Sequence, residues 1–469
     1  MTAPIGMEEL LAELDPNKPT ILFCTDSTRI HSGLSNSNRE LFKHIHAMGK
    51  YNIIQHGWCD ITPVERVPWR VLKTHIEKGP TGQLRMAPND KFGERSFDEF
   101  IEAGLKPDIV YNNGDPWMLN AAANSKYRNK FKLVSYITVD GEPAHTQFRK
   151  VFEAADVVIS LTEYGREVLH ASQLPCHAVI PLGVDLNQFN KQPRAQSLAN
   201  KKKYFGLDGN KILIGHVGRN QPRKQHPETI KAVYYIRSGN YVKCNRCGRI
   251  TTAPFNYIHN TVGSIPTACK WCLSSEIVKG KERPDIYLYM HTTIDESKHV
   301  GWNLEDICSR YFEGSIPVFF DENIRPSKGV TTNQLNDLYN TFDIFDLQTL
   351  GEGWGIPILE AMACGVPVVT TDAPAHTEFC GEVSSLVECN KICEPRTGVE
   401  RYYAITEDHI LKLLDLCGTN DKRIMQGERG IAAARNYNWN KISQAWSSLF
   451  DTMLATASKY KSWQNLKDI

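Results

Sequence analysis

Short hydrophobic runs alternate along the chain with longer stretches in which hydrophobic residues recur every three or four positions. In the first half the runs span residues 20–25, 51–58, 107–113, 131–138, 155–161 and 177–185. Their apolar residues are near-continuous, which is typical of buried β-strands, and helical patterns separate most of them. Residues 60–96 hold several Pro and Gly and few periodic hydrophobic positions, so we expect a long loop there. The alternation predicts a parallel sheet that helices cover on both faces.

The same alternation returns in the second half. Expected strands cover residues 211–219, 285–292, 316–320, 343–349 and 367–372, and expected helices begin near residues 227, 304, 332, 407 and 440. Before the first of these strands, Lys201, Lys202 and Lys203 lie in a polar stretch that we interpret as a solvated linker. We therefore predict an α/β protein with two Rossmann-like, doubly wound parallel sheets and a cleft between the two domains. The expected domains are residues 1–192 and 205–438, and segment 439–469 is expected to pack back on the first domain as a helix.

Composition narrows the class of protein only slightly. The chain has 469 residues, of which 41% are hydrophobic and 23% are charged, as is ordinary for a globular protein with large cores. Lys and Arg number 54 against 53 Asp and Glu, so net charge indicates neither a nucleic acid nor a membrane partner. No hydrophobic run approaches the ~18 residues of a membrane span, and no signal-peptide pattern opens the chain. We expect a cytoplasmic protein.

The stretch GEGWGIPILEAMACGVPVV, from Gly351 to Val369, is the clearest candidate for chemistry. It begins as a glycine-rich turn, continues as an expected helix of about three turns and ends in a β-branched run. Glu352 lies in the turn, whereas Glu360 lies inside the expected helix. Free N–H groups at a helix N-terminus favour a phosphate, and a carboxylate can accept two hydrogen bonds from sugar hydroxyls. The alternative is a capped core helix behind a strand.

Two cations follow the first strand of the second domain. The strand ends at Gly218-Arg219, and Lys224 lies five residues later, just before a helix. Arg can bind phosphate oxygens in a bidentate manner, and Lys supplies a point charge. Since both cations share a sheet edge with the Glu352 turn, they suit a diphosphate. Ordinary solvated surface cations are the alternative.

Small and polar residues also mark the carboxyl edge of the first sheet, where ligands of parallel sheets bind. They are Gly33, Asn113, Gly114, Asp115, Asp140 and Glu142. Gly33 lies in a loop before a helix expected to begin near Arg39, and a glycine there would let the backbone approach a ligand closely. For each of these residues a turn-forming role is the alternative.

Four of the 13 cysteines form two CxxC pairs. Cys244 and Cys247 are separated by 21 residues from Cys269 and Cys272, a spacing typical of a structural zinc site with four thiolate ligands. We predict a zinc-ribbon-like insertion over residues 239–283. Basic and aromatic residues surround its knuckles, namely Lys243, Arg246, Arg249 and Lys270, with Tyr241, Tyr257 and Trp271. They could bind a large acceptor such as DNA. The alternative is an ordinary solvated zinc knuckle.

Taken together, these features resemble the family-4 retaining glycosyltransferases, which have the two-domain GT-B fold. Glu352 and Glu360 match the E-x7-E signature of that family. Further segments resemble it in the expected order: the Gly33 loop, LTEYGREVL at 161–169, IPLGVDLNQF at 180–189, Gly218-Arg219 with Lys224, DLYNTFDIF at 337–345 and the region of Trp439. The resemblance covers most of the chain outside residues 60–96 and the cysteine-rich insertion.

The resemblance implies a nucleotide-diphosphate sugar donor, a UDP- or GDP-sugar, held mainly by the second domain. By analogy, Arg219 and Lys224 would neutralise the leaving diphosphate, and Glu360 would bind the ribose. Glu352 would hold the donor sugar and diphosphate with the backbone N–H groups of Gly353, Trp354, Gly355 and Ile356. The Gly33 loop would close on the donor from the other domain. The resemblance also implies retention of configuration and catalysis without a metal, and the chain has no Asp-x-Asp pair to hold one.

The chain departs from the family at one position. The family often has a His, commonly followed by an acidic residue, at the end of the strand that corresponds to residues 131–139. Here the sequence is TVDGEPAH, so Val139 occupies that position and Asp140 follows. We take Asp140 as the candidate contact to sugar or acceptor, with His145 as a weaker substitute.

Several functions remain open at this point. The acceptor is a glycan, a lipid, a small molecule, a protein or a modified DNA base. The same fold also hosts sugar-nucleotide epimerases and phosphorylases. A third class is a non-catalytic protein that binds a nucleotide sugar or nucleic acid, although the joint presence of Arg219, Lys224, Glu352 and Glu360 argues against it. Contacts to the base are expected near residues 320–328.

Overall fold

The chain divides into two compact units. One holds Met1–Asp185 with Tyr437–Ile469, and the other holds Leu186–Asn436. The structure, a computed structural model, describes residues 6–30, 32–256, 259–297, 300–312, 314, 317–320, 330–395 and 397–456. Residues 321–328, where contacts to the nucleotide base were expected, lie outside these ranges, and so does Tyr257 of the insertion.

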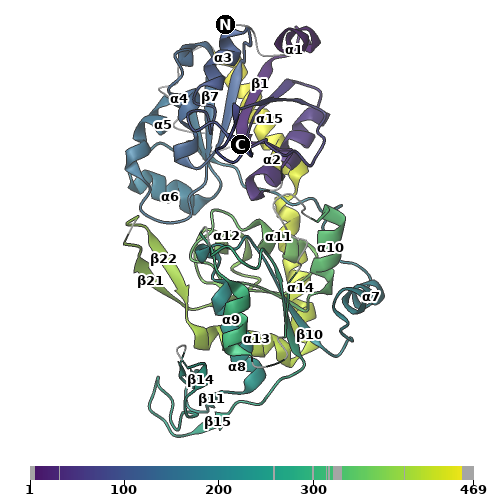
Figure 1. Cartoon of the computed structure of the whole chain (residues 1–469), viewed down its shortest axis with the longest axis vertical. Coiled ribbons are helices and arrows are strands. Elements are labelled where there is room, and N and C mark those ends of the chain that lie inside the picture. Colours follow the sequence, from purple (N-terminus) through teal and green to yellow (C-terminus); the bar gives the residue numbers. More distant parts are fainter. Residues whose placement is uncertain are drawn as a thin grey trace. The chain divides into compact units, whose positions relative to one another are not determined.

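The first unit is built on a parallel sheet whose seven described strands have the order β3-β2-β1-β6-β7-β8-β9. The strands are β1 (Thr20–Asp26), β2 (Asn52–Trp58), β3 (Arg70–Lys73), β6 (Ile109–Gly114), β7 (Lys132–Ile137), β8 (Val157–Ser160) and β9 (Ala178–Val179). Helices lie on both sides of the sheet (Figure 1), namely α1 (Met7–Glu13), α2 (Gly33–Ala47), α3 (Ser96–Glu102), α4 (Asn120–Ala123), α5 (Arg149–Ala154) and α6 (Glu163–Ala171). The hydrophobic runs of the sequence become its buried central strands, since Leu22, Ile54, Val110 and Leu133 are fully buried.

The last described helix, α15 (Trp439–Ala455), belongs to this first unit although it is far from it in sequence. The Trp446 ring lies 5.0 Å from that of Tyr111 and 4.9 Å from that of Tyr136, both in edge-on geometry. Tyr51 Oη donates to Asp451 Oδ1 over 2.5 Å. The helix thus buries its hydrophobic face on the first sheet.

The second unit contains a parallel sheet with the order β17-β16-β10-β18-β19-β20. Its strands are β10 (Ile212–Val217), β16 (Ile286–His291), β17 (Val318–Phe320), β18 (Ile344–Leu347), β19 (Val368–Thr371) and β20 (Ser385–Val387). Its described helices are α7 (Arg194–Phe205), α8 (His226–Ser238), α9 (Leu304–Tyr311), α10 (Thr332–Thr341), α11 (Ile356–Ala363), α12 (Thr377–Cys380), α13 (Thr406–Gly418) and α14 (Asn420–Ala434). Because β10 lies between β16 and β18, the loops that follow β10 and β18 are neighbours at the carboxyl edge of the sheet.

Two β-rich insertions extend this second unit. The cysteine-rich segment forms a three-stranded antiparallel sheet, β12 (Ile250–Thr252), β11 (Tyr241–Cys244) and β15 (Ile277–Lys279), beside a small hairpin of β13 (Phe255–Asn256) and β14 (Thr261–Val262). Tyr241 and Ile250 belong to the hydrophobic core of the unit, so the segment is packed onto it. A second hairpin, β21 (Cys389–Cys393) with β22 (Glu400–Ala404), projects from the body of the unit (Figure 1).

Two expectations about local structure in the first unit were wrong. Residues 60–96 contain β3 and a hairpin of β4 (Ile76–Lys78) and β5 (Leu84–Met86), whose half-exposed positions lack the hydrophobic run by which strands are recognised. The helix α2 begins at Gly33 rather than near Arg39, because Ser32 Oγ caps it by accepting from Ser35 N over 3.0 Å. Gly33 is therefore the first helical residue and not part of a loop.

The lysine-rich linker is in fact the end of helix α7. Lys201 is 1% exposed, its Nζ donates to Lys211 O over 2.7 Å, and it forms an ion pair with Asp343. A buried ammonium group requires such partners. They are the residues directly before strands β10 and β18, and the local sequence does not reveal that these lie beside Lys201.

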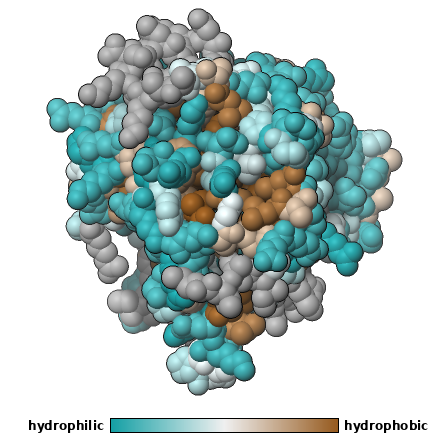
Figure 2. Space-filling model, turned by 90° about the horizontal axis from the view of Figure 1, so that it is seen from above, coloured by the Kyte–Doolittle hydropathy of each residue, from teal (hydrophilic) through white to brown (hydrophobic). Residues whose placement is uncertain are grey.

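The face seen in Figure 2 is mostly hydrophilic, with a group of hydrophobic residues, in brown, among the hydrophilic ones. Within the described residues no helix is both long enough and hydrophobic enough to cross a membrane.

Candidate functional site

A glycine-rich turn connects strand β18 to helix α11 over residues 348–355. Gly355 caps the helix with a φ of 99°, a left-handed conformation that strains other residues. A Cβ at Gly355 would lie 3.2 Å from the Cβ of His376, so there is also little space for a side chain. The turn places the N-terminus of α11 at the carboxyl edge of the sheet, where the positive end of the helix dipole favours an anion.

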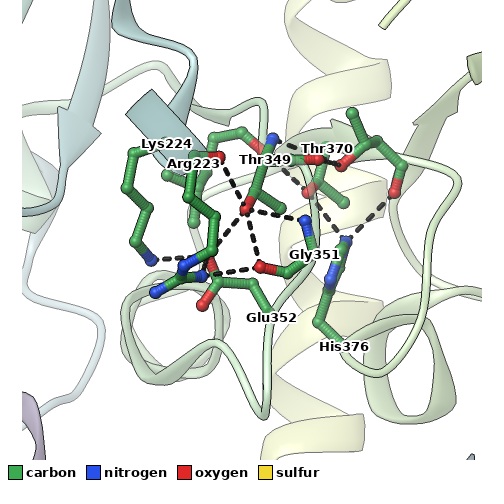
Figure 3. Close-up of polar contacts among 9 residues, drawn as sticks. Arg223, Lys224, Thr349, Gly351, Glu352, Thr370 and His376 are labelled. Carbon is green, nitrogen blue, oxygen red and sulfur yellow. Dashed lines mark hydrogen bonds and ion pairs between the residues drawn. The ribbon is translucent and has the colours of Figure 1, made fainter. Parts of the chain in front are cut away.

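Glu352 provides the carboxylate of this turn, and its side chain is only 6% exposed. Lys224 Nζ lies 2.5 Å from Glu352 Oε1, and Arg223 Nη1 lies 2.9 Å from the same oxygen (Figure 3). Thr349 Oγ1 also donates to it over 2.9 Å. Burial by itself raises the pKa of a carboxyl group, but the charges of Arg223 and Lys224 outweigh this effect and hold the pKa of Glu352 well below its usual 4.5. Glu352 is therefore an anion with two cations beside it.

The two cations come from a short 3₁₀ helix, Pro222–Lys224, that follows β10. Leu350 N donates to Arg223 O over 2.8 Å, and Arg223 Nη1 donates to Gly351 O over 2.6 Å. These bonds join the loop after β10 to the loop after β18. The arrangement gives a rigid group of one carboxylate and two cations at the sheet edge.

His376 supports the turn from the loop after β19. Its Nε2 lies 3.1 Å from Thr370 Oγ1 and 3.0 Å from Thr371 O, and the neighbouring Ala375 N donates to Glu352 O over 2.9 Å. Burial lowers the pKa of His376 to about 4, although the nearby Glu352 opposes this. His376 is therefore neutral at physiological pH and acts as a hydrogen-bonding support (Figure 3).

Two further buried histidines lie beside the loop after β10. The rings of His216 and His226 are 4.4 Å apart, and His226 Nε2 lies 3.4 Å from Gly218 O. Burial lowers the pKa of His226 to about 3 and that of His216 well below 6.5. Both rings are thus neutral, so the positive charge beside Glu352 belongs to Arg223 and Lys224.

Glu360 differs from Glu352 in its electrostatic environment. It lies within α11, and Tyr339 Oη donates to its Oε2 over 2.7 Å. Burial raises the pKa of Glu360 to about 7, while the hydrogen bond from Tyr339 opposes the increase. A carboxyl group with a pKa near neutrality can accept hydrogen bonds when ionised and donate one when protonated, and hydroxyl groups can pair with either form.

The structure brings together Lys224 and Glu352 as expected but does not add Arg219 to them. Arg219 is exposed, and the guanidinium beside Glu352 is that of Arg223. The short 3₁₀ helix folds Arg223 back over Gly351, which sequence reasoning missed. Its only signal in the sequence is a second basic residue next to Lys224, and this does not reveal which arginine reaches the carboxylate.

The remaining residues of the turn are buried. Trp354 is 4% exposed and its ring lies 4.8 Å from that of Phe379, so the indole packs against the protein. Gly353 is also buried, whereas Ile356 is half-buried.

In the first unit, expected residues lie at the carboxyl ends of β6 and β7 and at the start of α2. Gly33 opens α2, and a Cβ there would meet no atom within 4 Å. Asn113 is the penultimate residue of β6, before Gly114; it is buried, and its amide donates to Tyr136 O over 2.9 Å, which indicates a structural role. Asp140 follows β7 and is half-buried.

The four cysteines of the insertion form one cluster. Their sulfur atoms all lie within 4.8 Å of one another, and the pairs Cys244–Cys272 and Cys247–Cys269 are each 3.6 Å apart. A tetrahedral zinc ion with Zn–S bonds of about 2.3 Å requires sulfur separations of about 3.8 Å. The four thiols are not in disulfides, so the residues present fit zinc.

Comparison with known proteins is consistent with this site. The family model described as "Glycosyl transferases group 1" matches residues 320–398, a segment that includes the glycine-rich turn, Glu352 and Glu360. O-antigen chain mannosyltransferase B of Escherichia coli is 32% identical over 114 residues, which are 24% of this chain and 26% of that protein. The match therefore spans about a quarter of that relative.

Solved structures match over nearly the whole chain. Sucrose-phosphate synthase from Thermosynechococcus elongatus has a TM-score of 0.66 at 15% identity, and the alignment covers 94% of this chain and 100% of the synthase chain. Anabaena HepE in complex with UDP-glucose has a TM-score of 0.61 at 15% identity, and the alignment covers 92% of this chain and 99% of the HepE chain. These likenesses confirm the α/β GT-B fold with its parallel sheets. The match to the family model supports a glycosyltransferase.

Proposed function

We propose that the protein is a retaining glycosyltransferase that moves a sugar from a nucleotide-diphosphate sugar, a UDP- or GDP-sugar, to an acceptor hydroxyl. The observation that carries the proposal is the buried Glu352 carboxylate, fixed by Arg223 and Lys224 at the N-terminus of α11. A carboxylate between two cations, beside a helix N-terminus, suits a ligand that combines hydroxyl groups with a diphosphate.

The leaving diphosphate would be stabilised by this end of the second sheet. When the bond between the sugar C1 and the diphosphate oxygen breaks, negative charge develops on that oxygen. Lys224, the exposed Arg219 and the backbone N–H groups of residues 353–356 would bind it, and Arg223 would add a further positive charge. Such preorganised donors do the work that a metal ion does in other transferases, so we propose catalysis without a metal.

The two glutamates would hold the sugars. Glu352 would accept hydrogen bonds from hydroxyls of the transferred sugar, and Glu360 would bind the ribose hydroxyls. In a retaining reaction on one face of the sugar, the acceptor oxygen bonds to C1 as the diphosphate leaves. The acceptor proton then passes to the leaving phosphate, so no side-chain base is required in this scheme.

The first unit would contribute the residues at the carboxyl edge of its sheet. Asp140, which follows β7, is proposed to contact the sugar or the acceptor, and Gly33, at the start of α2, is proposed to contact the donor. The acceptor is a glycan, a lipid, a small molecule, a protein or a modified DNA base.

The cysteine cluster is proposed to hold one structural zinc ion. Cys244, Cys247, Cys269 and Cys272 would fill all four positions of a tetrahedral site, which leaves none open for a substrate. The ion would stabilise the insertion and take no part in sugar transfer. Metal analysis of the purified protein tests this, and a protein without zinc would refute it.

A screen of nucleotide sugars by thermal unfolding, followed by product analysis, tests the activity. A donor at about 100 times its Kd stabilises the folded protein by about 2.7 kcal/mol, which shifts Tm by several degrees. The stabilising donor, carrying a labelled sugar, should transfer that sugar with retained configuration. An epimerised nucleotide sugar, or a sugar phosphate formed from added phosphate, would identify an epimerase or a phosphorylase instead. If no nucleotide sugar binds, the proposal is refuted.

A further inference from the structure

The two middle residues of the second CxxC pair contact other parts of the second unit. Lys270 and Trp271 lie between Cys269 and Cys272, so two metal ligands would fix their backbone. Lys270 forms an ion pair with Glu407, near the start of helix α13. Thr252 Oγ1 donates to the same Glu407 oxygen over 3.1 Å. Glu407 is 9% exposed, so this buried carboxylate depends on the insertion for its partners.

The aromatic residue of the knuckle is engaged in the same contact. The Arg249 guanidinium carbon and Lys270 Nζ each lie 4.7 Å from the centre of the Trp271 ring. Trp271 Nε1 donates to Ile250 O over 2.8 Å, and Arg249 Nη2 lies 3.2 Å from Glu388 Oε1. Arg249 and Lys270 thus hold the insertion on its own unit. This arrangement favours a docking role for them over binding of nucleic acid.

Helix α13 connects this contact to the strand that leads into the glycine-rich turn. His409 lies two residues after Glu407 and is fully buried, with its Nε2 2.8 Å from Asp346 Oδ1 of strand β18. Gln348 Nε2 donates to the same Asp346 oxygen over 2.8 Å. Since Gln348 is the first residue after β18, the position of α13 is coupled to the start of the turn that contains Glu352.

Strand β22, immediately before α13, makes a second connection. Ile405, which lies between β22 and α13, donates its N–H to Glu388 O over 2.8 Å, so the end of β22 is tied to the residue that Arg249 contacts. Tyr402 N donates to Leu350 O over 3.0 Å, next to Gly351 and Glu352. Gln225 Nε2, which follows Lys224, donates to Tyr402 O over 3.2 Å. Both loops of the candidate site are therefore bonded to β22.

We propose that the metal-bound knuckle is a brace that positions the donor-binding loops through α13 and β22, with Lys270 and Glu407 as positioning residues. The inference rests on the proposed zinc and donor sites. Donor affinity would then depend on an ion that does not touch the donor. The physical reason is that the largely buried Glu407 loses the cation of the half-exposed Lys270 when the knuckle loosens, so α13 and β22 shift and the loops around Glu352 become less ordered.

The test compares Lys270→Met with Lys279→Met in the full-length protein. Lys279 is an exposed lysine of the same insertion, so its variant is the matched control. Each variant is examined for zinc content, for Tm, for the Kd of the stabilising nucleotide sugar by calorimetry, and for hydrogen exchange of residues 346–356. We expect Lys270→Met to retain zinc, to bind the nucleotide sugar about 5-fold or more weakly and to exchange faster at residues 346–356, while the control resembles the wild type.

The outcomes separate the brace from the proposed function. If Lys270→Met retains the wild-type Kd and the wild-type exchange at residues 346–356, the brace is refuted even when the wild type is an active transferase. If the wild type binds no nucleotide sugar, the proposed function fails, and exchange at residues 346–356 still decides for or against the brace. Equal effects of both lysine variants would also refute it, because they would reflect general charge loss in the insertion.

Discussion

Replacing Lys224 by Met separates the two roles that we assign to this residue, which are the ion pair with Glu352 and the binding of the leaving diphosphate. Lys224 and Glu352 are both buried, with side chains 9% and 6% exposed. Removing one partner of a buried ion pair costs about 3–5 kcal/mol when the other charge is left uncompensated. Here Arg223 still lies 2.9 Å from Glu352, so we expect a loss of unfolding free energy of about 3 kcal/mol or less. Urea unfolding measures this loss.

The pH dependence of that loss has a defined sign. The folded-state pKa of Glu352 is depressed, so its contribution to stability is present above its unfolded pKa of about 4.5 and is lost as pH falls through the lower folded value. Without Lys224 the pKa is less depressed. Acid unfolding of the Lys224→Met variant should therefore begin at a higher pH than that of the wild type.

Activity should respond separately from stability. Loss of one charge that stabilises the leaving group typically lowers kcat by about 10²–10³-fold. The double variant Lys224→Met with Glu352→Leu leaves no uncompensated carboxylate and should regain stability but not activity. Lys224→Arg, which keeps the charge, serves as the matched control. A Lys224→Met variant that folds normally and transfers sugar at the wild-type rate would show that Lys224 does not meet the donor.

Three other predictions concern single residues. Arg219→Met should change the unfolding free energy by no more than about 0.5 kcal/mol, because Arg219 is exposed, yet weaken donor binding in calorimetry; unchanged affinity would remove Arg219 from the site. His409 has its pKa raised to about 9, since Asp346 and Glu228 outweigh the effect of burial; its stabilisation is present below pH 6.5 and is lost as pH rises through 9. Between these pH values the unfolding free energy of the wild type, measured in urea, should thus fall by about 3 kcal/mol more than that of His409→Gln. An equal pH dependence of the two unfolding free energies would contradict an ion pair between His409 and Asp346. Asp140→Asn should lower turnover strongly and leave nucleotide binding nearly intact, and normal turnover would exclude Asp140.

The candidate site combines residues that sequence reasoning identified with others that it did not. The Glu352 turn and Lys224 stand out because a glycine-rich turn before a helix and a cation after a strand are local patterns. Thr349, three residues before Glu352, is a local partner, but the second cation is not. Arg223 meets Glu352 because β10 and β18 are neighbours in the sheet, and the order of these strands along the chain does not specify that pairing.

The basic and aromatic residues of the insertion illustrate the same limit. Their composition is compatible with a nucleic acid surface, and the spacing of the cysteines correctly predicts that four thiols converge. Whether Lys270 and Arg249 face solvent or the protein depends on Glu407 and Glu388, which are more than 130 positions away in sequence. Only the packing of the insertion on α13 decides this.

By itself, the sequence determined the features that arise within one element or one short segment. The two parallel sheets follow from hydrophobic runs, the helix N-terminus follows from glycines, and the cysteine cluster follows from two CxxC knuckles. The tertiary structure alone decided which charges are paired, as for Arg223 rather than Arg219 beside Glu352, and for Lys201 buried against Asp343. The physical reason is that hydrophobic periodicity and turn geometry act between near neighbours, whereas a buried charge is satisfied by whichever distant loop the sheet order brings to it.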